Sequence, residues 1–187
     1  MERKPTLTTI AIEKLHPHPD NPRKVIGDID ELADSIKANG ILQNLTVVPM
    51  NDDWTEFTVI IGHRRLAAAK QAGLTELPCA VVEMTEKEQL STMLTENMQR
   101  SDLTVYEEAK GCQLLLDLGD TVAEVAETTG FSESKIRRRV KLCELDEDAF
   151  KESQIRQPTL QDYDRLNQIK DIDVRNELLT SIGTNNF

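Results

Sequence analysis

The stretch FTVIIGHRRLAAAKQAGL (Phe57–Leu74) combines a strand, a glycine and a helix in direct succession. Its first residues are apolar and mostly β-branched, which favours a strand. Gly62 interrupts this run, and the segment that follows predicts a helix that ends at Gly73. The sequence therefore places a tight strand-to-helix corner at Gly62.

Strands and helices alternate around this corner up to about residue 100. The segment Thr8–Leu15 begins with a short β-like stretch. Strands are predicted at Leu45–Met50, Phe57–Gly62 and Leu77–Met84, and the first two of these form a hairpin. A helix is predicted within residues 28–40, with Asp28 or Asp30 as its N-terminal cap and Gly40 after its end. Three prolines in residues 16–24 exclude a regular helix there and favour an extended or turning loop.

After about residue 100 the patterns are helical almost to the end of the chain. We therefore expect an α+β protein of two domains. Residues 1–100 would form a small mixed-sheet domain, and residues 101–187 an all-α domain.

Composition limits the classes of protein that this chain can represent. No apolar run reaches about 18 residues and no signal peptide is recognisable, so we expect a cytoplasmic protein without a membrane span. The three cysteines lack metal-like spacing, which favours reduced thiols. The net charge is −11, with 22 Lys and Arg against 33 Asp and Glu. Nucleic-acid binding is therefore expected only where the basic residues gather.

The corner at Gly62 has the composition of a phosphate-binding site. Glycine lets a ligand approach the backbone, and the free N–H groups of a helix N-terminus attract an anion. Arg64 and Arg65 add guanidinium groups that bind phosphate oxygens. The alternative is a solvated basic turn, and this motif alone does not separate the two interpretations.

Two further segments carry polar groups suited to a nucleotide. Glu96, Asn97 and Arg100 lie within about one helical turn, and carboxylate and amide oxygens are hard ligands suited to Mg²⁺. Taken alone, these residues also fit an interdomain hinge with polar surface groups. Arg23 lies in the loop that the prolines stiffen.

The segment TVAEVAETTGFSESKIRRRVKLCEL (Thr121–Leu145) has the pattern of a helix-turn-helix. Gly130 allows the turn, and Ser132 or Ser134 can cap the second helix. Ile136, Val140 and Cys143 predict its buried face. The remaining face is basic and, with the two serines, gives the predicted DNA-contacting set: Ser132, Ser134, Lys135, Arg137, Arg138, Arg139 and Lys141.

Five basic residues within seven positions stand out in an acidic chain. A recognition helix needs such residues for phosphates and guanine edges in the major groove of double-stranded DNA. The alternative is a solvated basic face on a helical hairpin. Turn chemistry and charge agree, so we favour DNA binding.

Three motifs in this order and spacing resemble those of the ParB partition family. They are HPDNPRK (His18–Lys24), GHRR (Gly62–Arg65) and ENMQR (Glu96–Arg100), and with the helix-turn-helix the resemblance covers about residues 8–145. It implies a homodimeric DNA clamp in chromosome or plasmid segregation, switched by CTP with Mg²⁺ and associated with the nucleoid or a plasmid. The implied nucleotide-site residues are Arg23, Gly62, His63, Arg64, Arg65, Glu96, Asn97 and Arg100, with Glu96 and Asn97 holding Mg²⁺.

The sequence departs from the family pattern in three places. His63 stands where the family usually has Glu, which leaves slow CTP hydrolysis open. About six residues precede the first strand, which does not favour a ParA-type ATPase partner, and nothing resembles the family's C-terminal dimerisation segment. A DNA-binding regulator without nucleotide switching is the alternative function, and a nuclease is not favoured.

Overall fold

The computed structural model describes residues 5–21, 27–100 and 102–184. The chain divides into two compact units, Met1–Asn97 and Met98–Phe187. This division falls at the C-terminal end of a helix, and each unit is described by itself.

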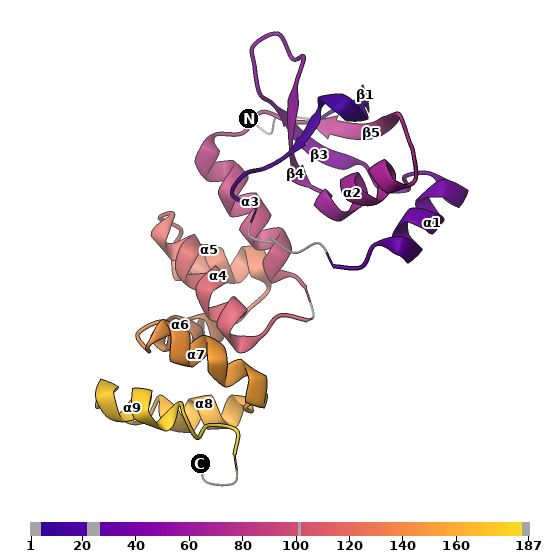
Figure 1. The fold of residues 1–187 in the computed structure, drawn as a ribbon. Helices are drawn as coiled ribbons and strands as arrows, with labels where there is room; N and C mark the ends of the chain where they lie inside the picture. Colours follow the sequence, from indigo (N-terminus) through magenta and orange to yellow (C-terminus); the bar gives the residue numbers. More distant parts are fainter. Residues whose placement is uncertain (1–4, 22–26, 101, 185–187) are drawn as a thin grey trace. The chain divides into compact units, whose positions relative to one another are not determined.

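The N-terminal unit contains a five-stranded mixed sheet in the order β1-β5-β3-β4-β2 (Figure 1). Its strands are β1 Thr6–Ala11, β2 Leu15–Pro17, β3 Leu45–Pro49, β4 Phe57–Ile61 and β5 Glu76–Val81. The predicted β3–β4 hairpin is confirmed, and β1 pairs antiparallel with β5. The short β-like stretch predicted at the start of Thr8–Leu15 lies in β1, and a 3₁₀ turn at Ile12–Lys14 separates β1 from β2. The predicted proline loop begins as strand β2, which runs parallel to β4.

Helices cover both faces of this sheet, and the alternation of side chains along β3 and β4 explains how. Val47 and Val59 belong to one buried cluster, together with Leu66 and other side chains of the first two helices. Val48 and Ile60 point to the opposite face and pack with Met93. The helices of this region are α1 Asp30–Asn39, α2 His63–Gln71 and α3 Glu86–Met98.

The ends of α1 follow the predicted signals in part. Asp28 accepts a hydrogen bond from the Asp30 backbone N–H at 2.9 Å, whereas Ile29 occupies the N-cap position itself. Gly40 follows the helix with φ +72°, a conformation that glycine adopts readily. The carboxylate of Asp28 therefore satisfies an N–H group that the helix leaves unpaired.

The C-terminal unit is built from helices alone among its described residues. They are α4 Val105–Asp117, α5 Val122–Thr129, α6 Glu133–Leu142, α7 Glu147–Ser153, α8 Leu160–Leu166 and α9 Ile172–Leu178, with a 3₁₀ turn at Gln154–Arg156. Phe150 lies at the centre of the core, with its ring edge-on to Tyr106 and Tyr163 at centroid distances of 5.3 and 5.7 Å. The two units together confirm the predicted α+β class.

Helices α5 and α6 form the predicted helix-turn-helix. Gly130 ends α5 with φ +76°, and the Ser132 hydroxyl caps α6 by accepting the Lys135 backbone N–H at 3.2 Å. The predicted buried face is partly wrong. Ile136 is fully buried, but Arg139 and Leu142 complete the face, while Val140 and Cys143 are half-buried. The helix is therefore rotated slightly from the predicted orientation.

The three cysteines are free thiols, and Cys79 and Cys112 are buried. Burial raises the pKa of each of these two thiols to about 11, so both stay protonated at neutral pH. No helix in the described part of the chain has the length and apolar character needed to cross a bilayer.

Candidate functional site

Gly62 joins β4 directly to α2 and occupies the N-cap position of that helix with φ +109°. The first turn of α2 contains no acidic residue, and no side chain caps its N–H groups. This turn carries Arg64 and Arg65 instead, and their positive charge opposes the helix dipole. An anion bound at this corner would satisfy both the free N–H groups and the arginines.

The corner requires glycine for two reasons. A side chain at φ +109° is strained, and a Cβ atom on Gly62 would lie 3.0 Å from Leu45 Cγ and 3.4 Å from Arg65 Cζ. The guanidinium of Arg65 therefore packs directly against the backbone of the turn.

Both arginines are fixed by backbone carbonyl groups. Arg65 Nη1 donates to the carbonyl oxygens of Gln43 and Asn44 at 2.5 and 2.8 Å. Arg64 Nη2 donates to the carbonyl oxygen of Asp28 at 3.0 Å. Each guanidinium has five N–H donors, so both retain donors for a ligand. Burial lowers the pKa of Arg65, and the nearby Glu96 carboxylate opposes this shift.

These groups surround a pocket of about 300 Å³ within the N-terminal unit, at the small end of the range for ligand sites. Its lining residues are Asn21, Leu32, Gly62, His63, Arg64, Arg65 and Glu96. Each of the three predicted motifs contributes to this lining: Asn21 comes from HPDNPRK, four residues come from GHRR, and Glu96 comes from ENMQR. Asn21 and Leu32 were not predicted. Asn21 belongs to the HPDNPRK motif, which was a signal for it, whereas Leu32 lies in the helix predicted within residues 28–40 and had no signal as a site residue.

His63 lines this pocket. Its Nε2 accepts a hydrogen bond from the His18 backbone N–H at 3.3 Å. Burial, reinforced by the nearby His18, lowers the pKa of His63 to about 4. The imidazole is therefore neutral at pH 7 and ties residue 18 to the corner.

Three of the predicted nucleotide-site residues are not placed in the pocket. Arg23 lies outside the described residues. Asn97 follows Glu96 on α3 but is not among the described residues that line the pocket. Arg100 belongs to the C-terminal unit, where it forms an ion pair with Asp102 at 2.7 Å.

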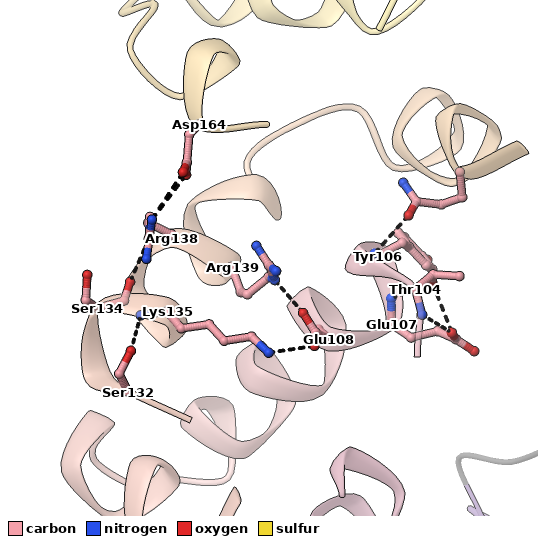
Figure 2. A network of polar contacts seen from close by, with 11 residues as sticks. Thr104, Tyr106, Glu107, Glu108, Ser132, Ser134, Lys135, Arg138, Arg139 and Asp164 are labelled. Carbon is pink, nitrogen blue, oxygen red and sulfur yellow. Dashed lines mark hydrogen bonds and ion pairs between the residues drawn. The ribbon is translucent and has the colours of Figure 1, made fainter. Parts of the chain in front are cut away.

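The exposed face of α6 carries most of the predicted DNA-contacting side chains (Figure 2). Ser132 and Ser134 are exposed to solvent at its N-terminal end. Arg137 is 65% exposed and pairs with Glu133 one turn earlier, while Arg138 is 52% exposed and pairs with Asp164 of α8. Lys141 Nζ donates to the Asn167 carbonyl oxygen at 2.6 Å.

Arg139 is a correction to the predicted DNA-contacting set. Its side chain is 7% exposed, and its Nε donates to Glu108 Oε2 at 2.6 Å. Glu108 of α4 also binds Lys135 Nζ at 2.7 Å, and this ammonium group lies 3.4 Å from the centre of the Phe131 ring. Arg139 and Lys135 therefore hold α6 against α4. Glu108 could not be recognised from the sequence, because its partners lie about 30 positions away.

These features define a class of two-unit protein, in which a mixed-sheet unit with a basic pocket precedes a helix-turn-helix unit. Residues 1–98 match the ParB N-terminal domain family, and the chain belongs to this family. Solved structures agree with this assignment. A C-terminally truncated chromosome-partitioning protein ParB from Caulobacter crescentus, crystallised with the centromeric parS site, has a TM-score of 0.73 and 27% identity, covering 93% of this chain and 92% of that one.

Sequence relatives carry similar names. The chromosome-partitioning protein Spo0J of Thermus thermophilus is 39% identical over 143 residues, covering 75% of this chain and 52% of the relative. A probable chromosome-partitioning protein ParB of Xylella fastidiosa is 39% identical over 142 residues, covering 74% of this chain and 45% of the relative. The chain therefore spans about half the length of these relatives. A pNOB8-like ParB N-domain, 17% identical with a TM-score of 0.63, shares the fold; the alignment covers 88% of this chain and 75% of that one.

Proposed function

We propose that this protein is a sequence-specific DNA-binding partition protein that acts as a CTP-dependent clamp in chromosome or plasmid segregation. Family membership and the names of the relatives support the partition role. The observation that carries the nucleotide part is the pocket at Gly62, where two arginines and an uncapped helix N-terminus face one carboxylate.

The residues of this pocket fit a nucleoside triphosphate with its metal ion. The first-turn N–H groups of α2 and the guanidinium groups of Arg64 and Arg65 would bind phosphate oxygens. Glu96 is the one acidic side chain among the described lining residues, and its oxygens would hold Mg²⁺. Asn97 does not line the pocket, and its part in holding Mg²⁺ rests on the family resemblance alone. The preference for CTP over other nucleotides rests on the family resemblance.

The DNA interface would be the N-terminal half of α6, as is usual for a recognition helix. Ser132, Ser134, Arg137 and Arg138 are exposed there, and Lys141 extends the same face. The Caulobacter protein that was crystallised with its centromeric site supports DNA binding by this chain. Two copies would act together, because a clamp needs a partner to close around DNA, and the protein would therefore associate with the nucleoid or a plasmid.

Isothermal titration calorimetry tests the nucleotide site directly. Titration of CTP with Mg²⁺ into the intact protein is expected to give saturable heat, and Arg65→Ala is expected to abolish it. Lys70→Ala removes a positive charge from the exposed far end of the same helix and should bind CTP as the unaltered chain does. The absence of binding by any nucleoside triphosphate would reject the proposal.

His63 favours a second candidate, a DNA-binding regulator without nucleotide switching. A neutral imidazole stands where the family usually has an acid, and its acceptor nitrogen, Nε2, already binds the His18 backbone N–H, so it offers no free base for hydrolysis. If this candidate is right, Arg65→Ala leaves DNA binding by the protein unchanged. If the protein is a clamp, Arg65→Ala abolishes the response of its DNA binding to CTP.

A further inference from the structure

The basic residues of α6 are each bound by an oxygen of a neighbouring group (Figure 2 draws several of these contacts). Glu108 holds the two that are buried or half-buried, and Glu133 pairs with Arg137 within the helix. The remaining two basic residues, Arg138 and Lys141, contact α8. Helix α8 therefore lies along the face that is proposed to read DNA.

The contacts between α6 and α8 have matching helical spacing. Arg138 and Lys141 are three positions apart on α6, and their partners Asp164 and Asn167 are three positions apart along the α8 segment. Residues at this spacing lie on one face of a helix. These two contacts join α6 to α8 and place Asp164 beside Arg138.

The guanidinium of Arg138 is held on two sides. Its Nη1 donates to Asp164 at 3.2 Å, with the second carboxylate oxygen at 3.5 Å, and its Nε lies 3.4 Å from the Ser134 carbonyl oxygen. Its Nη2 has no hydrogen-bond partner among the described residues, and half of the side chain is exposed. The group is thus oriented in advance, and the N–H groups of Nη2 together with the second N–H of Nη1 leave two parallel donors for a ligand.

We propose that Asp164 is a specificity-determining residue that positions Arg138 to read a guanine. Arginine reads guanine by donating two parallel hydrogen bonds to O6 and N7, and a side chain that is already oriented loses less conformational entropy on binding. The carboxylate also repels DNA phosphates, which disfavours use of Arg138 as a plain backbone contact. Asp164 would thus strengthen base reading and weaken non-specific binding.

This inference rests on the proposed DNA binding, and one experiment separates the two. Fluorescence anisotropy would measure binding of the intact chain to the tightest duplex selected from a random pool and to a scrambled duplex. Asp164→Asn is expected to tighten binding to the scrambled duplex and to lower the selected-to-scrambled affinity ratio by about fivefold or more, the discrimination of one guanine contact. Relaxed preference at a single G·C pair, measured with a panel of substituted duplexes, is the expected signature.

Two further variants make the result specific to the pair. Glu152→Gln removes the same charge from an exposed position on α7 that pairs with no α6 side chain among the described residues, and it should leave the ratio unchanged. Arg138→Lys keeps the charge but removes the fork, so adding Asp164→Asn to it should have no further effect on base preference. Circular dichroism would verify that each variant is folded.

Each other outcome has a definite meaning. If Asp164→Asn strengthens binding to both duplexes by the same factor, Asp164 only competes with DNA for Arg138, and the inference is overturned. Any other result that leaves the selected-to-scrambled affinity ratio unchanged also overturns it. If the unaltered chain discriminates between the duplexes and the variant does so equally well, the DNA-binding function stands and this inference fails. If the unaltered chain binds neither duplex, both fail.

Discussion

Replacement of Glu108 by alanine tests whether two cations of α6 serve the fold rather than DNA. The Glu108 carboxylate is 15% exposed and bridges Arg139 Nε at 2.6 Å and Lys135 Nζ at 2.7 Å. Its removal leaves the Arg139 guanidinium, which is 7% exposed, buried without its charged partner. Breaking a buried pair in this way costs about 3–5 kcal/mol. Because Glu108 keeps some contact with water, we expect a loss of about 3 kcal/mol.

Urea unfolding with two optical probes shows whether this loss of stability is confined to the C-terminal unit. The single tryptophan, Trp54, lies in the N-terminal unit, whereas six of the nine described α-helices lie in the C-terminal unit. Glu108→Ala should shift the unfolding transition seen by circular dichroism at 222 nm to lower urea and leave the Trp54 fluorescence transition in place. Glu127→Ala, at an exposed position on α5, is the control and should change stability by less than about 0.5 kcal/mol.

A double variant separates loss of charge pairing from loss of packing. Glu108→Leu combined with Arg139→Met replaces the pair by apolar side chains, which is often neutral or stabilising. We expect it to recover most of the stability that Glu108→Ala loses. A cost below about 1 kcal/mol for Glu108→Ala would refute the reasoning and return Arg139 to the candidate DNA-contacting residues.

Three further variants test other parts of the structure. Burial lowers the pKa of His63 from 6.5 to about 4, so the folded state disfavours the protonated imidazole and the stability of the N-terminal unit should decline as the pH falls from about 6.5 to about 4. The urea midpoint of the Trp54 fluorescence transition measures this decline, and His63→Gln should make it less steep. Gly62 and Gly73 both have a positive φ, but a Cβ atom would meet close neighbours only at Gly62. Gly62→Ala should therefore lower the free energy of unfolding more than Gly73→Ala does, and of the two only Gly62→Ala should weaken CTP binding in calorimetry. Buried Arg175 leaves Nε and Nη1 without partners among the described residues, so Arg175→Met should unfold at equal or higher urea than the unaltered chain by circular dichroism.

The sequence predicted those parts of the fold that depend on local signals. The β3–β4 hairpin follows from two β-branched runs, and the turn between α5 and α6 follows from Gly130 and a serine cap. It missed strand β2 because that strand has three residues and exists only through pairing with β4, which is distant in sequence. The prolines around β2 indicated a loop and concealed it.

The candidate sites were predictable where one short segment carries the chemistry. Gly62 and its two arginines are contiguous, so the phosphate corner could be recognised from the sequence. Partners that come from distant elements could not, and Glu108 and Asp164 are the clearest examples. Arg139 was assigned to DNA because a basic run shows charge but not which residue faces the core. Because the helical period is 3.6 residues, the sequence defines the rotation of α6 about its own axis only to about one residue position.

Retention of the protein on DNA with blocked or open ends tests the central claim, a clamp that CTP closes. Biolayer interferometry can follow the protein on the selected duplex, first with both ends blocked and then with one end opened, in a high-salt wash. With CTP and Mg²⁺ we predict salt-resistant retention on the blocked duplex, its loss when one end is open, and none for Arg65→Ala. Retention that is the same with and without CTP, or the same on blocked and open duplexes, would contradict the account.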